Sequence, residues 1–119
     1  MEITASATAE FDAGHLIKEL LACTRQHGHF YVVTASVTGE LDPVFGWPRG
    51  TQNLPTDLGD LVSEVNGRNL NELMPGVVTT PVGIAANFLE RLLGRYPTLV
   101  AVGVKCSDGT SGTVTRTPR

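Results

Sequence analysis

The sequence has little of several features that would assign it to a familiar class of protein. It has two cysteines, which could pair in principle, but nothing points to an oxidising compartment. Only Lys18 and Lys105 of its nine basic residues are lysines. A net charge of −3 argues against a nucleic-acid partner, which favours a basic surface. No apolar run approaches the roughly 20 residues that span a membrane, and no signal peptide is visible. We expect a cytoplasmic protein that binds neither nucleic acid nor membranes.

The composition is that of an ordinary globular domain. Hydrophobic residues make up 41% of the 119 positions and charged residues 18%, which is enough for one hydrophobic core. Nothing in the chain repeats, and no segment is of low complexity. The sequence therefore predicts a single domain over residues 1–119.

Alternating polarity marks four strands. Residues 3–11 alternate between apolar side chains at odd positions and polar side chains at even positions. Residues 29–39 likewise carry apolar side chains at odd positions, from Tyr31 to Val37. Both patterns are typical of strands with one buried face. Residues 98–106 and about 112–117 flank a turn at 107–110 and predict a closing hairpin.

Two helices are predicted between the strand pairs. The first covers about 57–66, with Thr56 or Asp57 as its N-cap, and the second begins at Pro81, which suits the first turn of a helix. Residues 43–55 and 68–80 are expected to be loops. The order ββααββ indicates the α+β class.

Three histidines are the strongest functional signal. His27 and His29 stand two residues apart at the start of a strand, so their side chains share a face. His15 ends the first strand and can meet them if the two strands pair antiparallel. Three imidazoles with an open fourth position are typical of catalytic zinc, although unrelated surface histidines are the simpler alternative.

Four stretches, in order along the chain, resemble one known family. They are Phe11-Asp12-Ala13-Gly14-His15, Cys23-x-x-x-His27-Gly28-His29, the pair Gly39–Pro43 and Asp57–Leu61, and Arg68-Asn69-Leu70-Asn71. Together they resemble the 6-pyruvoyl- and 6-carboxy-tetrahydropterin synthases.

The resemblance implies a mechanism and an assembly. His15, His27 and His29 would hold Zn2+, and Cys23 would be the general base that removes a proton beside a zinc-polarised carbonyl or hydroxyl. The family's fold is a four-stranded antiparallel sheet with two helices on one face. Its members form trimers or hexamers with active sites at subunit interfaces, so a homo-oligomer acting on a small molecule is expected.

Three departures from the family pattern concern the substrate. Asn66-Gly67 stands where the family has an Asp-His pair that assists the cysteine. The glutamate that anchors the pterin ring aligns with Cys106, or with Asp108 if the register slips by two. The segment Thr80–Gly83 lacks the family's glutamate. Losing a buried acceptor costs roughly 1–3 kcal/mol per unpaired donor, so the departures predict a changed substrate.

Four residues are candidates for contacts with that substrate. They are Arg68, Thr80, Cys106 and Asp108. Simpler roles compete with this interpretation, because Cys106 lies among valines typical of a core and Arg68 can satisfy loop carbonyls.

The leading hypothesis is a zinc-dependent enzyme with a non-pterin or modified substrate, in specialised natural-product metabolism. Enolisation-linked elimination, aldol cleavage, isomerisation or cyclisation would all suit a Lewis-acidic zinc beside a proton acceptor. Two alternatives remain open: an ordinary tetrahydropterin synthase with relocated catalytic groups, and a non-catalytic zinc-binding module.

Overall fold

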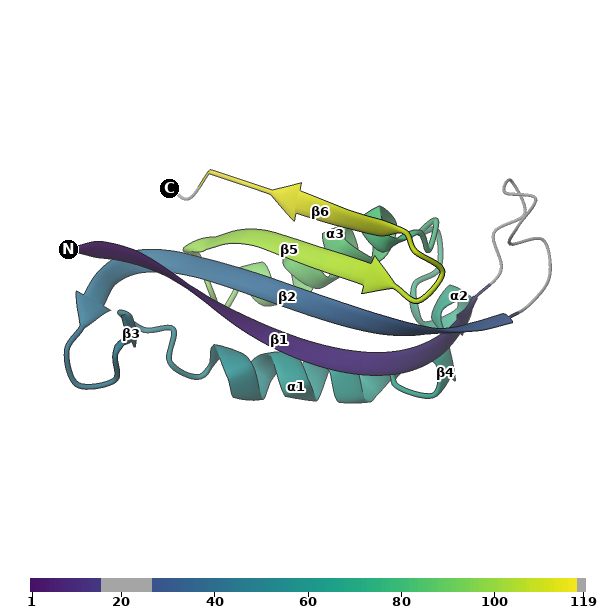
Figure 1. Cartoon of the computed structure of the whole chain (residues 1–119), viewed down its shortest axis with the longest axis horizontal. Coiled ribbons are helices and arrows are strands. Elements are labelled where there is room, and N and C mark those ends of the chain that lie inside the picture. The colour runs from purple at the N-terminus through teal and green to yellow at the C-terminus, as the bar shows by residue number, and fades with distance from the viewer. Residues whose placement is uncertain (16–26, 118–119) are drawn as a thin grey trace.

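The computed structural model describes residues 1–15 and 27–117, with only the backbone of His27, and Cys23 lies outside the described residues. The α+β class is confirmed: helices cover one face of a mostly antiparallel sheet (Figure 1). The elements are β1 (Glu2–His15), β2 (His27–Asp42), β3 (Trp47–Pro48), α1 (Leu54–Val65), β4 (Arg68–Asn69), α2 (Leu70–Leu73), α3 (Pro81–Leu93), β5 (Leu99–Cys106) and β6 (Ser111–Thr115).

The sheet has six strands rather than the expected four. Its order is β4-β1-β2-β5-β6, and β3 pairs with β2 beside this path. The two extra strands are only two residues long and fall in segments expected to be loops. Each pairs with the end of a long strand, β3 with Leu41–Asp42 of β2 and β4 with Ala13–Gly14 of β1. Pairs this short carry no periodicity that a sequence could reveal.

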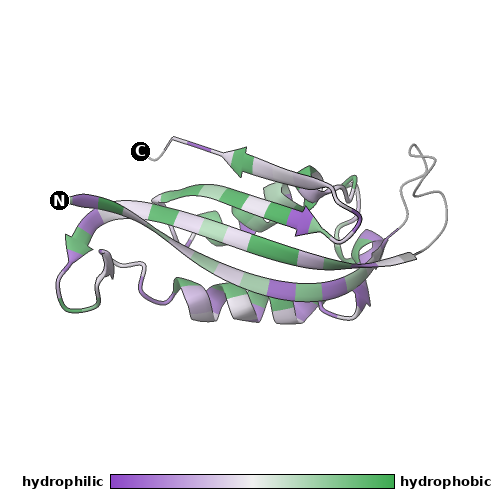
Figure 2. Ribbon diagram, viewed as in Figure 1, coloured by the Kyte–Doolittle hydropathy of each residue, from purple (hydrophilic) through white to green (hydrophobic). Residues whose placement is uncertain are grey.

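The long strands β1 and β2 separate an apolar face from a hydroxyl-rich face. Phe11 and Tyr31 are register partners, and both are buried under the helices. On the opposite face the hydroxyls of Ser6 and Ser36 lie 2.7 Å apart. Figure 2 shows the resulting recurrence of hydrophobic residues along β2. The alternation of residue types thus decides which face the helices cover.

The two main helices begin at prolines or close to them. Helix α3 begins at Pro81, as predicted, with Thr80 as N-cap: its hydroxyl accepts the Gly83 amide at 3.2 Å. Helix α1 begins at Leu54, three residues before the expected start, with Asn53 rather than Thr56 or Asp57 as N-cap. Pro55 lies in its first turn, where proline is tolerated because the missing N–H has no helical partner. No helix among the described residues is long and apolar enough to span a membrane.

Candidate metal site

The pairing of β1 with β2 brings the ends that carry the histidines together. The strands pair antiparallel as expected, with His15 opposite His27 and Ala13 opposite His29. Residues directly opposite one another project from the same face, as do residues two apart on one strand. The pairing therefore puts His15 and His29 on the core-facing side of one sheet end, with His27 at the register position opposite His15. Their joint role as metal ligands remains a prediction.

The described rings of His15 and His29 have a spacing that suits a shared cation. Their centroids lie 5.0 Å apart, and their planes are nearly perpendicular at 88°. Two imidazoles bound to one tetrahedral zinc at about 2.0–2.1 Å would place their centroids about 5 Å apart. His15 is 2% exposed, and His29 is half-buried. The residues present thus fit a divalent metal ion.

A backbone carbonyl fixes the tautomer of His15. Nδ1 of His15 lies 2.9 Å from the carbonyl oxygen of Thr79, which can only accept a hydrogen bond. Nδ1 therefore carries the proton, and Nε2 carries the lone pair that a metal would use. The hydroxyl of Tyr31 lies 3.5 Å from the same Nδ1. The sequence predicts neither neighbour, although Tyr31 follows His29 by two residues on the same face.

Two of the four proposed substrate-binding residues lie beside His29. Cys106 ends β5 opposite Tyr31, and Asp108 follows in the turn to β6. One ligand atom from each of His29, Cys106 and Asp108 can be chosen so that all lie within 4.8 Å of one another. Cys106 is 8% exposed, and burial raises the pKa of its thiol.

Asp108 is exposed and held as an anion by its own turn. Oδ1 of Asp108 accepts the Thr110 hydroxyl at 2.6 Å and the Thr110 amide at 2.9 Å. The hydroxyl bond is the main reason that the pKa of Asp108 falls to about 2. The site thus has one permanent carboxylate, at the expected alternative position.

The other two proposed residues lie elsewhere. Arg68 is exposed on β4, which pairs with the edge of β1 that faces away from β2. The Thr80 hydroxyl caps α3, although Thr80 directly follows the residue that holds His15. Arg68 and Thr80 are therefore not part of the group formed by His29, Cys106 and Asp108, because one lies on β4 and the other caps α3.

Asn66 and Gly67 form a turn that is tied to β1. The Asn66 side chain accepts the Asp12 amide at 2.9 Å, and the Gly67 amide donates to the Asp12 carbonyl at 2.6 Å. Gly67 has a φ of +73°, the left-handed region that favours glycine. A hollow of about 360 Å³ lies beside this turn, with His29 and Ser107 in its wall. The pair therefore serves the backbone and brings no acid or base to the site.

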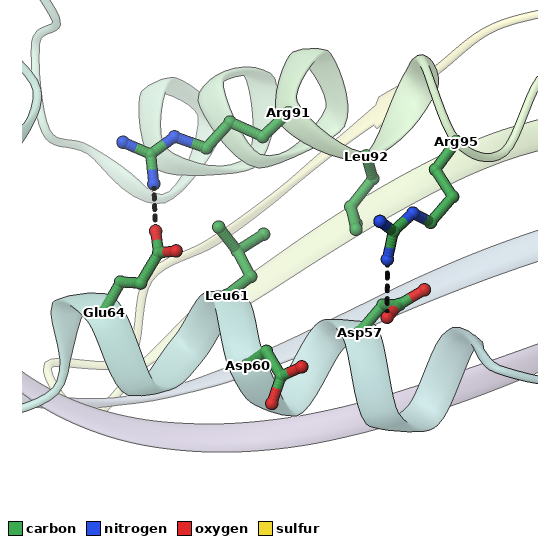
Figure 3. Close-up of a pocket in the computed structure, with 7 residues that line it drawn as sticks. All are labelled: Asp57, Asp60, Leu61, Glu64, Arg91, Leu92 and Arg95. Carbon is green, nitrogen blue, oxygen red and sulfur yellow. Dashed lines mark hydrogen bonds and ion pairs between the residues drawn. The ribbon is translucent and has the colours of Figure 1, made fainter.

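A second hollow, of about 410 Å³, lies between α1 and α3, away from the histidines. Figure 3 shows that two arginines in its wall each bind an acidic side chain of α1. Arg91 meets Glu64 at 3.2 Å, and Arg95 meets Asp57 at 2.9 Å. The Tyr96 hydroxyl also donates to Asp57. These contacts stabilise the helix pair, and no metal-binding group lies among them.

Comparison with known proteins identifies the family. The family model described as 6-pyruvoyl tetrahydropterin synthase matches residues 4–116. The chain belongs to this family. The match spans both long strands, both main helices and the closing hairpin, so the family assignment applies to the whole described fold.

Solved structures share the fold of this synthase-family chain. A 6-pyruvoyl tetrahydropterin synthase from Caenorhabditis elegans is 23% identical, with coverage of 98% of this chain and 97% of that one and a TM-score of 0.85. An uncharacterised protein from Wolinella succinogenes is 15% identical, with coverage of 98% and 99% and a TM-score of 0.80. The Plasmodium falciparum synthase is 13% identical, with coverage of 97% and 98% and a TM-score of 0.72.

Family membership indicates an enzyme of the tetrahydropterin synthase type that acts on a small molecule. The group of His29, Cys106 and Asp108 gives this family member a possible metal-binding cluster. Cys106 and Asp108 lie at the end of β5 and in the turn that follows it, where the resemblance to the family predicts contacts with the substrate rather than with the metal.

Proposed function

We propose that the protein is a zinc-dependent member of the tetrahydropterin synthase family that acts on a non-pterin or modified substrate, in specialised metabolism. The observation that carries this proposal is the identity of the β5 terminus. Where the family is expected to have a ring-binding glutamate, this chain has the buried thiol of Cys106. A thiol is a weak acceptor and cannot bind a row of N–H donors as a carboxylate does.

The metal would be held by His15, His27 and His29. The spacing of the His15 and His29 rings and the Nε2 lone pair of His15 support this ligand set. When bound, zinc supplies a Lewis acid that polarises a carbonyl or hydroxyl oxygen of the substrate. Three protein ligands and an open position are the usual catalytic arrangement.

The chain's own groups would orient this site and move a proton. The Thr79 carbonyl holds His15 in one tautomer and orientation, as partners of metal-binding histidines do. Cys23 is the proposed general base that removes a proton next to the polarised oxygen. Elimination, aldol cleavage, isomerisation and cyclisation all need a base that takes a proton from a carbon or a hydroxyl of the substrate. Asn66-Gly67 stands in place of the Asp-His pair that would assist Cys23.

The proposal includes a cytoplasmic homo-oligomer, a trimer or a hexamer. Strand β6, residues Ser111–Thr115, is at one end of the strand order, and this edge of the sheet has no partner strand among residues 1–15 and 27–117. An exposed edge favours pairing with another strand. The sheet order therefore supports association between copies.

A direct assay on dihydroneopterin triphosphate tests the changed substrate. We expect zinc-loaded protein to form no pterin product, while an ordinary family member assayed in parallel does. The variant Cys106→Glu restores a carboxylate at the β5 terminus and is expected to increase neopterin binding. Turnover by the unaltered chain at the rate of the control enzyme would contradict the proposal.

One observation favours a second candidate, an ordinary synthase with a relocated ring-binding group. Asp108 is an exposed anion within 4.8 Å of a ligand atom of His29. If pterin turnover is found and Asp108→Asn abolishes pterin binding while Asp60→Asn does not, the relocated-carboxylate alternative holds.

A further inference from the structure

We propose that Cys106 and Asp108 bind the same cation as His29, adding a sulfur and an oxygen ligand to the histidine set. This inference rests on the metal of the proposed function. It adds ligands that neither the histidine spacing nor the family resemblance supplies.

The position of β2 within the sheet brings these groups together. Strand β2 lies between β1 and β5, so His29 has His15 on one side and Cys106 on the other. Tyr31, the register partner of Cys106, is two residues from His29 on the same face. The Cys106 side chain therefore projects to the side of the sheet that carries the histidines.

The distances bring three kinds of ligand atom to one place. A ring nitrogen of His29, Sγ of Cys106 and a carboxylate oxygen of Asp108 all lie within 4.8 Å of one another. A zinc ion binds nitrogen at about 2.0–2.1 Å and sulfur at about 2.3 Å, so its ligand atoms lie roughly 3–4 Å apart. The group thus needs only small side-chain movements to close on a cation.

The exposure of the three side chains increases from Cys106 through His29 to Asp108. Cys106 is buried, His29 is half-buried, and Asp108 is exposed. The cluster therefore extends from the core to the surface, and a cation can enter beside Asp108.

The donor set would determine which cation is bound. Sulfur and nitrogen ligands favour zinc and cobalt over magnesium or calcium, which prefer oxygen. Binding converts the Cys106 thiol to a thiolate, and its proton passes to solvent. Three histidines, the thiolate and the carboxylate make five ligands, the expanded coordination of zinc, so a substrate oxygen would bind by replacing one of them, and Asp108 is the exposed one.

Cobalt titration of the metal-free protein tests the sulfur ligand. Thiolate bound to Co2+ absorbs strongly in the near ultraviolet, whereas Co2+ bound only by nitrogen and oxygen does not. We expect this absorption in the wild type and in Cys23→Ser, the matched control at the chain's other cysteine. It should vanish in Cys106→Ser, and Asp108→Asn should keep it but require more Co2+ for saturation.

Two outcomes overturn the proposal and leave the histidine site intact. One is Co2+ binding by the wild type without the absorption, and the other is absorption lost in Cys23→Ser and kept in Cys106→Ser. An unchanged Co2+ titration in Asp108→Asn removes Asp108 from the set. Failure of the wild type to bind Co2+ or zinc would sink the zinc proposal as well.

X-ray absorption spectroscopy of the zinc-loaded Cys23→Ser protein tests the sulfur ligand with Cys106 unchanged, because Cys106 is then the one cysteine in the sequence. A scatterer at about 2.3 Å is expected from sulfur, and a shell only at about 2.0–2.1 Å would contradict the proposal.

Discussion

Nδ1 of His15 donates to the backbone carbonyl of Thr79, 2.9 Å away and 64 residues along the chain. This bond joins the end of β1 to the segment that leads into α3. The hydroxyl of Thr79 lies 3.3 Å from the same nitrogen, and both residues are buried. The orientation of the candidate metal ligand therefore depends on how the start of α3 is packed.

Gly83 controls that packing. A Cβ on Gly83 would lie 1.9 Å from the Val78 carbonyl oxygen, so Gly83→Ala must displace the backbone beside Thr79. We expect a loss of about 1–3 kcal/mol in the free energy of unfolding, measured in urea, and weaker zinc binding. Gly94→Ala is the matched control, because a Cβ there meets nothing within 4 Å. Equal effects of the two substitutions would show that the approach of Gly83 to Val78 is unimportant.

Tyr96 stabilises the fold through a hydrogen bond to a charged group. Tyr96→Phe removes the hydroxyl that donates to Asp57 and should cost about 1.5–3 kcal/mol at pH 7. Arg95→Gln should cost much less, because the Arg95 side chain is 71% exposed. Comparable losses in the two variants would count against the buried hydroxyl as the stronger contact.

The hydrogen bond between Tyr96 and Asp57 predicts that the free energy of unfolding depends on pH. The Tyr96 hydroxyl, with Arg95, lowers the pKa of Asp57, so the carboxylate favours the folded state above its unfolded pKa of about 3.9. That stability is lost as the pH falls through the lowered, folded value. The difference between wild type and Tyr96→Phe should therefore shrink in acid, as measured by urea unfolding from pH 7 to pH 3. A difference that grows in acid would reverse the sign of this argument.

The ionisation of Asp108 depends on one hydroxyl. Thr110→Val removes the donor that does most to lower the pKa of Asp108 to about 2. We expect that pKa to rise toward about 3.9 in a carbon-detected NMR titration. Thr115→Val changes a threonine at the far end of β6, remote from the turn, and should leave the pKa of Asp108 unchanged. An Asp108 pKa still near 2 in Thr110→Val would assign the shift to another neighbour.

Asn66 has a structural role in this account. Asn66→Ala removes the acceptor for the Asp12 amide and should cost about 0.5–1.5 kcal/mol, measured by urea unfolding, without changing zinc content. Asn66→Asp keeps the acceptor and should be better tolerated. Loss of zinc in Asn66→Ala would instead place this side chain in the metal site.

The sequence predicts the parts of the fold that depend on periodicity. Alternation along β1 and β2 predicts their buried face, and antiparallel pairing then brings His15 opposite His27. The start of α3 is predicted because Pro81 suits the first turn of a helix. These features depend on residues that are neighbours in sequence or on the two-residue periodicity of side chains along a strand.

Other features depend on contacts that no local pattern encodes. The bond from Thr79 to His15 uses a backbone carbonyl, which every residue has, so nothing in the sequence distinguishes Thr79. The start of α1 is misplaced because Pro55 resembles a loop residue, although it lies in the first turn of the helix. Cys106 and Asp108 are alternatives in an alignment, yet the turn after β5 brings both beside His29.

Zinc content tests the central claim most directly. Purified wild-type protein should contain about one zinc per chain by mass spectrometry, and His15→Ala and His29→Ala should lose it. Ser36→Ala is the control, because Ser36 lies on β2 with its hydroxyl on the opposite face of the sheet. Loss of zinc in both histidine variants with retention in the control is the predicted result. Full zinc content in His29→Ala would contradict a metal site at this end of the sheet.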